Sequence, residues 1–362
     1  MQREIGSNFW LSPNDVYGEV SLGSPEIFGF TGTDYVWLSS GRSAIRLVIE
    51  EIENRNGDLR KAVVLPSFTC HTVFEPFLKK GYEVYYYPIG KDLRTTADAI
   101  MATAMEHDAS IVLFHRYFGF DTLNGDIDIV CDKLRSMGKY SIEDCTQCLY
   151  SNIPRAESDF TVGSIRKWAG VPDGGFAICR SGSFNNKPHI SDINLEKAKL
   201  DASFAKYRFL FENHGEKTVF LQKFREAEDI LARQVDIFTI ADFSIKVQSN
   251  LNVNELRDKR ASNFRYLANS IKAPVAPLFT IDSSEMVPLY YPILVEDRHS
   301  LQQHLVKNDI YAPVVWPKDE QQPEQCEGAE HLYNHLLCIP IDQRYDEDDM
   351  NRAAEVINNF YR

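Results

Sequence analysis

The sequence lacks long apolar segments, an excess of basic residues and any glycine-rich or proline-rich tract. Because no apolar run approaches the roughly 20 residues that cross a bilayer, we expect neither a membrane span nor a membrane partner. Over 362 residues, 39 Lys and Arg stand against 52 Asp and Glu, a net charge of −13 that disfavours nucleic acid as a partner. A charged fraction of 25% and a hydrophobic fraction of 44% exclude a disordered chain, a collagen or a coiled coil.

Patterns typical of disulfide frameworks and metal sites are also missing. The seven cysteines are odd in number and several lie in apolar runs, so we expect reduced thiols and a cytoplasmic location. Residues 1–15 are polar and mixed, and we expect no signal sequence. Cys145 and Cys148 form a C-x-x-C pair, but no second Cys/His pair follows at zinc spacing, and we expect no metal. The zinc-protease, P-loop and dinucleotide-binding motifs do not occur.

The order of apolar segments predicts an α/β fold. In the first two thirds of the chain, short buried-type strands alternate with helices, which indicates a mainly parallel sheet covered on both faces. We expect a large three-layer α/β/α domain over 1–245, with an N-terminal segment that could pack on a smaller α+β domain over 246–362. The expected strands are 36–38, 62–65, 84–87, 110–114, 140–142, 176–179, 287–295 and 311–316. Helices are expected from Ser43, through 73–78 and 127–137, from about 253, over 301–306 and over 346–360, and the segment 190–240 is polar and helix-prone.

Polar and aromatic side chains follow four of the expected strands, and a fifth such stretch begins at Ser164, a strand end to which no strand range is assigned. Ligands bind beyond the carboxyl ends of parallel strands, so these stretches are candidate site residues. They are residues 39–43, 66–71, 115–118, 143–147 and 164–168. Gly41 precedes a helix whose first N–H groups are unpaired, and with Arg42 and Ser43 it could hold an anion. The simpler interpretation is a helix N-cap by Ser40 or Ser43.

Two further side chains, those of Asp144 and Lys167, are candidates for a chemical role. Asp144 ends a strand, where a partly buried carboxylate needs a cation or hydrogen-bond donors. It could pair with a protonated ring nitrogen, with Gln147 reaching the same ligand, or it could serve as a structural cap or ion pair. Lys167 lies among apolar, aromatic and glycine residues, and burial would lower the pKa of its amine and favour Schiff-base chemistry. The alternative for Lys167 is an ordinary solvated lysine.

The order and spacing of three motifs resemble the DegT–DnrJ–StrS family of sugar aminotransferases, which are pyridoxal-phosphate enzymes of fold type I. The motifs are residues 65–69 (Leu-Pro-Ser-Phe-Thr), 142–147 (Ile-Glu-Asp-Cys-Thr-Gln) and 164–175, and the resemblance extends over nearly the whole chain. It implies that Lys167 binds the cofactor covalently, that Asp144 pairs with the pyridinium nitrogen, and that Gln147 lies near the phenolic oxygen. It further implies that the turn at Gly41, Arg42 and Ser43, together with Ser164, holds the phosphate.

The sequence departs from the family pattern in three places. The aromatic residue that commonly stacks on the cofactor ring is replaced by Cys70, and His71 is the favoured substitute. The stretch between Asp159 and Lys167 is shorter than in typical members. The Asn-Tyr-Arg segment by which a second subunit contacts the phosphate is missing, and Tyr207-Arg208 is a faint candidate for it.

The resemblance implies amino transfer by a homodimer. An amino acid, expected to be glutamate, would donate the amino group, and a ketosugar, expected to be nucleotide-linked, would accept it in sugar biosynthesis. The cofactor would alternate between pyridoxal 5′-phosphate and pyridoxamine phosphate. Two alternatives stay open: another pyridoxal-phosphate reaction on the same scaffold, such as a dehydratase or lyase, and a non-catalytic regulatory or binding protein that retains the fold.

Overall fold

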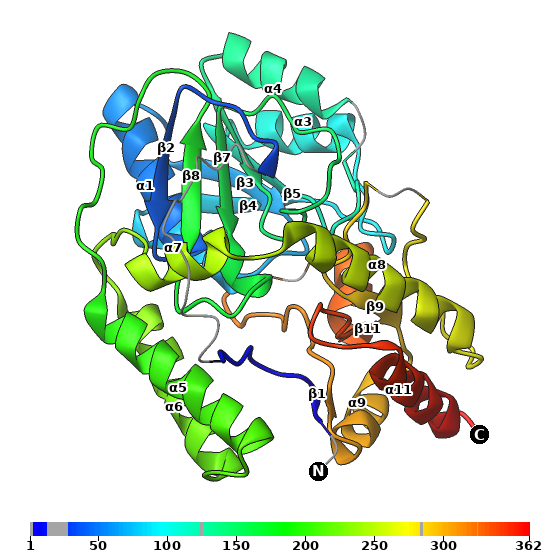
Figure 1. The fold of residues 1–362 in the computed structure, drawn as a ribbon. Coiled ribbons are helices and arrows are strands. Elements are labelled where there is room, and N and C mark those ends of the chain that lie inside the picture. The colour runs from blue at the N-terminus through cyan, green and yellow to red at the C-terminus, as the bar shows by residue number, and fades with distance from the viewer. Residues whose placement is uncertain (1–2, 13–27, 124–125, 283–284, 324) are drawn as a thin grey trace. The chain divides into compact units, whose positions relative to one another are not determined.

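The computed structural model describes residues 3–12, 28–123, 126–282, 285–323 and 325–362 (Figure 1). The chain forms two compact units, each assembled from separate stretches of sequence. Unit 1 comprises Met1–Ser7, Leu59–Asp159 and Val253–Arg362. Unit 2 comprises Asn8–Asp58 and Phe160–Asn252. The seven strands of the main sheet divide between the units, with the order β6-β5-β3-β4 in unit 1 and β2-β8-β7 in unit 2.

The strands that unit 1 contributes to the main sheet are all parallel. They are β3 (Ala62–Pro66), β4 (Glu83–Tyr87), β5 (Ile111–His115) and β6 (Tyr140–Asp144). The helices between them are α2 (His71–Lys79), α3 (Ala97–Glu106) and α4 (Ile127–Ser136). Every residue of β3 and β5 is buried, as continuous apolar runs in a parallel sheet require.

The C-terminal part of unit 1 combines helices with short strands. The helices are α8 (Val253–Ser270), α9 (Arg298–Lys307), α10 (Glu327–His335) and α11 (Glu347–Phe360). Strands β9 (Tyr291–Leu294) and β11 (Leu336–Ile339) pair antiparallel, and β10 (Ile310–Tyr311) pairs in parallel with β1 (Ile5–Gly6). Helix α11 packs against α8 and α9. Its N-terminus carries a capping box in which Asp346 and Asp349 each accept a hydrogen bond from the other's backbone N–H.

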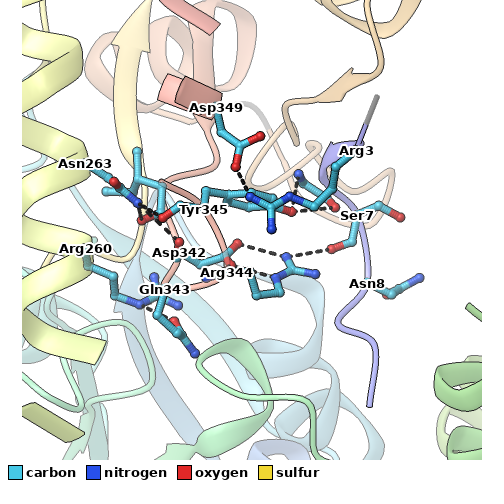
Figure 2. A network of polar contacts seen from close by, with 12 residues as sticks. Arg3, Ser7, Asn8, Arg260, Asn263, Asp342, Gln343, Arg344, Tyr345 and Asp349 are labelled. Atoms are coloured by element: carbon cyan, nitrogen blue, oxygen red, sulfur yellow. Dashed lines mark hydrogen bonds and ion pairs between the residues drawn. The ribbon is translucent and has the colours of Figure 1, made fainter. Parts of the chain in front are cut away.

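A buried polar network holds the segment before α11 to the rest of unit 1 (Figure 2). The Nδ2 atom of Asn263 donates to the carbonyls of Ile341, Asp342 and Tyr345 at 3.2, 3.3 and 3.1 Å. Arg344 donates to Asp342 from Nε and Nη2. Burial alone would raise the pKa of the Asp342 carboxyl, but the positive charges of Arg344 and Arg260 outweigh burial and lower that pKa. The result is a charged cluster that fixes residues 341–345 against α8.

The described residues of unit 2 form antiparallel strands and five helical segments. The strands β2 (Asp34–Leu38), β8 (Gly175–Cys179) and β7 (Phe160–Ser164) place β8 between its two neighbours. The helical segments are α1 (Gly41–Arg55), the 3-10 turn η3 (Ile165–Lys167), α5 (Ile193–Phe211), α6 (Lys217–Arg233) and α7 (Asp242–Ser249). Helix α1 packs on all three strands, and α5 and α6 lie side by side as a helical hairpin, drawn in green in Figure 1.

The structure confirms the α/β class and the mainly parallel sheet, and α5 and α6 fill the segment 190–240 that we expected to be helix-prone. The strand expected over 311–316 is wrong in extent, because β10 ends at Tyr311. Helices α3 and α10 and strands β7 and β11 had no counterpart in the prediction. Unit 1 combines residues 59–159 with residues 253–362, and the expected boundary between 1–245 and 246–362 stays a prediction.

Candidate functional site

The carboxyl ends of β3, β5 and β6 bring three polar side chains of unit 1 together. Parallel pairing places His115 directly opposite Asp144. The His115 Nδ1 atom lies 3.6 Å from Asp144 Oδ2, and its Nε2 atom lies 2.6 Å from Thr69 Oγ1. All three residues are buried, with exposed fractions of 8% or less. His115 therefore bridges the hydroxyl of Thr69 and the carboxylate of Asp144.

The Asp144 carboxyl stays charged in this position. Burial alone would raise its pKa, but hydrogen bonds from His115 and from the Thr146 backbone, the latter 2.9 Å from Oδ1, outweigh burial and lower the pKa. A buried carboxylate kept as an anion stabilises a positive charge placed beside it. This is the property expected of a partner for a protonated ring nitrogen.

The side-chain amide of Gln147 uses its oxygen, but not its nitrogen, in hydrogen bonds with the described residues. Its Oε1 atom accepts a hydrogen bond from the Phe118 backbone N–H at 2.9 Å. Its Nε2 atom is buried and has no hydrogen-bond partner among the residues that the structure describes. An unsatisfied buried donor is costly, so this amide is suited to an acceptor oxygen of a ligand.

Cys70 and His71 lie at the start of α2, also in unit 1. Cys70 is the N-cap residue and is partly exposed. The Nδ1 atom of His71 lies 2.8 Å from Asp319 Oδ2, and its side chain is 38% exposed. Stacking of His71 on a cofactor ring stays a prediction.

Sequence reasoning missed Trp316, whose ring centroid lies 5.7 Å from that of His115, since no expected motif includes it.

In unit 2, the first turn of α1 is the turn that the sequence marks as a candidate anion site. Ser40 caps the helix by accepting a hydrogen bond from the Ser43 N–H at 3.1 Å, and the two hydroxyl oxygens lie 3.0 Å apart. Gly175 on β8 touches this turn so closely that a Cβ there would lie 2.3 Å from the Ser40 carbonyl carbon and 2.7 Å from Gly41 N. Arg42 extends toward the end of α6, where its Nη1 atom is 3.4 Å from the Ala232 carbonyl.

Ser164 and Lys167 follow the end of β7. Gly175 pairs with Ser164 on one side and with Leu38, just before the α1 turn, on the other. The Ser164 hydroxyl donates to the Gly174 carbonyl at 3.0 Å. Lys167 ends the turn η3 and is partly buried, with no hydrogen bond or ion pair to any other described residue. Unit 2 thus brings a lysine amine, a serine and a helix N-terminus to the same end of its strands.

The remaining sequence candidates include Cys148, Tyr207 and Arg208, which lie among other residues of the protein's own structure. Burial raises the pKa of the Cys148 thiol to about 11, and Arg155 Nη1 lies 3.2 Å from its sulfur. Within the described ranges, no group of three His, Cys, Asp or Glu side chains could hold a metal ion. Tyr207 and Arg208 lie inside α5, where the Tyr207 ring packs on Phe211 at 5.0 Å. Among the helices of the described segments, none has the length and apolar character needed to cross a membrane.

Comparisons with known proteins relate the fold to aminotransferases. No protein-family model matches the sequence, and no curated protein matches it. Among solved structures, PseC of Helicobacter pylori, an aminotransferase involved in the biosynthesis of pseudoaminic acid, has a TM-score of 0.68 at 15% identity, covering 99% of both chains. The sugar aminotransferase CalS13 from Micromonospora echinospora has a TM-score of 0.64 at 16% identity, covering 90% of this chain and 87% of its own.

A third structure carries the family name that the sequence motifs resemble. A DegT DnrJ EryC1 StrS aminotransferase from Brucella abortus has a TM-score of 0.63 at 18% identity, covering 93% of this chain and 87% of its own. Identities this low, over nearly complete chains, report shared architecture. The chain therefore has the fold of these aminotransferases, which is the fold type I architecture.

Proposed function

We propose that this protein is a pyridoxal-phosphate-dependent aminotransferase that moves an amino group from an amino acid to a keto group on a sugar. The observation that carries the proposal is Asp144, a buried carboxylate held in its charged form by His115 and Thr146. A buried carboxylate that stays charged suits a ligand that brings a positive charge to it. The fold, which sugar aminotransferases share, supports the same proposal.

The residues present fit the cofactor. Asp144 would hold the protonated ring nitrogen, and the unsatisfied Nε2 atom of Gln147 would donate to the phenolic oxygen. The cradle at Gly41 and Ser43, which a Cβ at position 175 would fill, suits the phosphate, with Ser164 nearby in unit 2. When bound, the cofactor supplies an electron sink for the amino acid α-carbon.

The protein's own groups would orient the cofactor and move a proton. Lys167 Nζ, with no partner among the described residues, is available to bind the cofactor covalently and afterwards to accept and return a proton. His115 and Thr69 would fix the orientation of the Asp144 carboxylate, so that its charge faces the ring nitrogen. Glutamate is the proposed donor, and a nucleotide-linked ketosugar the proposed acceptor.

The test is a visible absorption spectrum of the purified protein with added pyridoxal phosphate, before and after borohydride. We expect a yellow band that reduction converts into a stable adduct on the peptide containing Lys167, and no such adduct in Lys167→Ala. Amino transfer from glutamate to a panel of nucleotide-linked ketosugars then tests the reaction. A wild-type protein that stays colourless would contradict the proposal and favour a regulatory or binding role.

We further propose a cytoplasmic homodimer. The location is supported by the seven cysteines, all of which are free thiols. The dimer follows from the family resemblance, and light scattering of the purified protein tests it. A monomeric protein that still transfers the amino group would contradict this part of the proposal alone.

A further inference from the structure

Three consecutive residues of unit 2, Asp173, Gly174 and Gly175, each contact a different element around Lys167. The Gly174 carbonyl accepts hydrogen bonds from the Ser164 hydroxyl at 3.0 Å and from the Ile165 N–H at 3.2 Å, so it supports the turn η3 that ends in Lys167. Gly175 touches the first turn of α1, as described above. Asp173 contacts α7. We call residues 173–175 the hinge turn.

Asp173 anchors the hinge turn to the beginning of α7. Its Oδ1 atom accepts from the Ser244 hydroxyl at 2.5 Å, and both carboxyl oxygens accept from the Ala241 N–H, at 3.2 and 3.1 Å. The Asp173 N–H donates back to the Ser244 oxygen at 3.2 Å. Asp173 is 1% exposed and Ser244 is fully buried. Three hydrogen bonds to the carboxyl group and one from the backbone N–H therefore fix Asp173 in one orientation.

The anchor limits how the hinge turn can move. Gly174 has a φ of +135°, and a Cβ there would lie 2.5 Å from Ile165 Cγ1, so the turn is packed tightly against η3. The Gly174 N–H also donates to the Ser39 carbonyl at 2.8 Å, one residue before the α1 cap. A shift of Asp173 would move Gly174 and, through it, both Ser164 and the turn that carries Lys167.

Asp173 has no reacting group as a neighbour in unit 2. Its hydrogen-bond partners are Ser244 and Ala241. Burial raises the pKa of its carboxyl to about 7, and these hydrogen bonds and the charge of Arg166 offset only part of that rise. The hydrogen bonds of Asp173 join α7 to the residue that precedes Gly174, and this geometry indicates a role in holding the turn next to Lys167.

We propose that Asp173 is a positioning residue: through Ser244 and α7 it holds the hinge turn that sets the positions of Ser164 and Lys167 in unit 2. This inference rests on the proposed function for the role of Lys167, but the positional claim can be tested on the protein without cofactor. Ser244 supports the same role, because its hydroxyl group forms hydrogen bonds with the carboxyl and with the backbone N–H of Asp173.

The first experiment is hydrogen exchange on the cofactor-free protein, wild type against Asp173→Asn and Ser244→Ala. We expect exchange about tenfold faster in peptides containing Ile165 and Gly174, whose N–H groups are bonded within this arrangement, and little change over α5. Glu51→Gln is the matched control, since Glu51 is also a buried carboxylate in unit 2 and accepts from the Asn185 N–H at 2.9 Å, away from the hinge turn.

The second experiment measures the dissociation constant for pyridoxal phosphate and the visible circular dichroism of the bound form. Asp173→Asn and Ser244→Ala should each weaken binding about tenfold and reduce the dichroic band, and the double variant should lose little more, because the two residues act as a unit. Glu51→Gln should leave both readouts near wild type.

The outcomes separate the two proposals. Faster exchange spread evenly over unit 2, or unchanged exchange at Ile165 and Gly174, would overturn the positioning role whatever the protein catalyses. If Asp173→Asn does not fold, Ser244→Ala decides by the same criteria. A wild type that never binds pyridoxal phosphate would refute the proposed function, while the exchange result would still decide whether Asp173 holds the hinge turn.

Discussion

Replacing Gly175 by alanine should separate β8 from the first turn of α1. The added Cβ would lie 2.3 Å from the carbonyl carbon of Ser40, 2.4 Å from its oxygen and 2.7 Å from the nitrogen of Gly41. Attractive contacts between such atoms begin at about 3.5 Å. Because all three atoms are backbone, no side-chain rotation relieves the overlap. The turn or the strand must move by roughly 1 Å to restore ordinary contact distances.

Two magnitudes follow from this displacement. Overpacking of this kind costs about 1–3 kcal/mol of unfolding free energy. The same turn presents the N–H groups proposed to hold the cofactor phosphate, and a misplacement of about 1 Å in an active site can cost about 100-fold in rate. We therefore expect Gly175→Ala to unfold at lower urea concentration and to bind pyridoxal phosphate at least about tenfold more weakly.

Gly57→Ala provides the matched control in the same unit. A Cβ at position 57 has Glu53 O as its nearest neighbour, at 3.9 Å, so the substitution meets no obstacle and should be neutral or stabilise by about 0.4–1 kcal/mol. Urea unfolding and a cofactor titration on both variants give the comparison. A Gly175→Ala protein as stable as wild type would refute the steric reasoning, and one that is destabilised but binds the cofactor normally would refute the phosphate cradle.

Three further predictions concern single side chains. Lys167→Ala should lower turnover by at least about 10³-fold, measured as amino transfer from glutamate, because the variant lacks the amine proposed to bind the cofactor and move the proton; near-normal turnover would contradict the assignment. Asp144→Asn should retain some cofactor but lose about 10²–10³-fold in rate, because the charge that stabilises the protonated ring is gone, and a wild-type rate would argue against that role. Burial raises the pKa of the Asp173 carboxyl from 3.8 to about 7 in the folded protein. The group therefore contributes most to stability below pH 4. Its contribution to the free energy of unfolding is lost as the pH rises through 7, by at most about 4 kcal/mol. Unfolding curves at pH 5 and pH 8 should therefore differ less in Asp173→Asn than in wild type, and an equal difference would show that the wild-type carboxyl is already ionised at pH 5.

The central strands were predictable because their sequences have one interpretation. The runs Ala62–Leu65 and Ile111–Phe114 are apolar throughout, and only a strand buried on both faces accommodates them. Helix α3 was missed since it buries only Ile100 and Ala104 and therefore has little apolar periodicity. The strand expected over 311–316 failed at Pro313, which cannot donate to a ladder, so β10 stops after two residues.

The candidate site was predictable only where a motif marks it. Asp144, Gln147 and Lys167 belong to stretches that stand at strand ends, and the sequence order sufficed to select them. The contact between Thr69 and His115 depends on strand neighbours that are 46 residues apart. Asp173 likewise depends on Ser244, 71 residues further along the chain, and no local pattern connects the two. Long-range partners of this kind appear only when the fold is known.

The pairing of β1 with β10 has a consequence for how the chain is made. Ile5 lies opposite Ile310, so β1 has no partner until about 300 more residues have been made, roughly 15–60 s at about 5–20 residues per second. During that interval the N-terminal strand is an unpaired edge in a nascent chain. Closure of so long a loop is slow relative to local helix formation, so β1 acquires its native pairing only after most of unit 1 has been made.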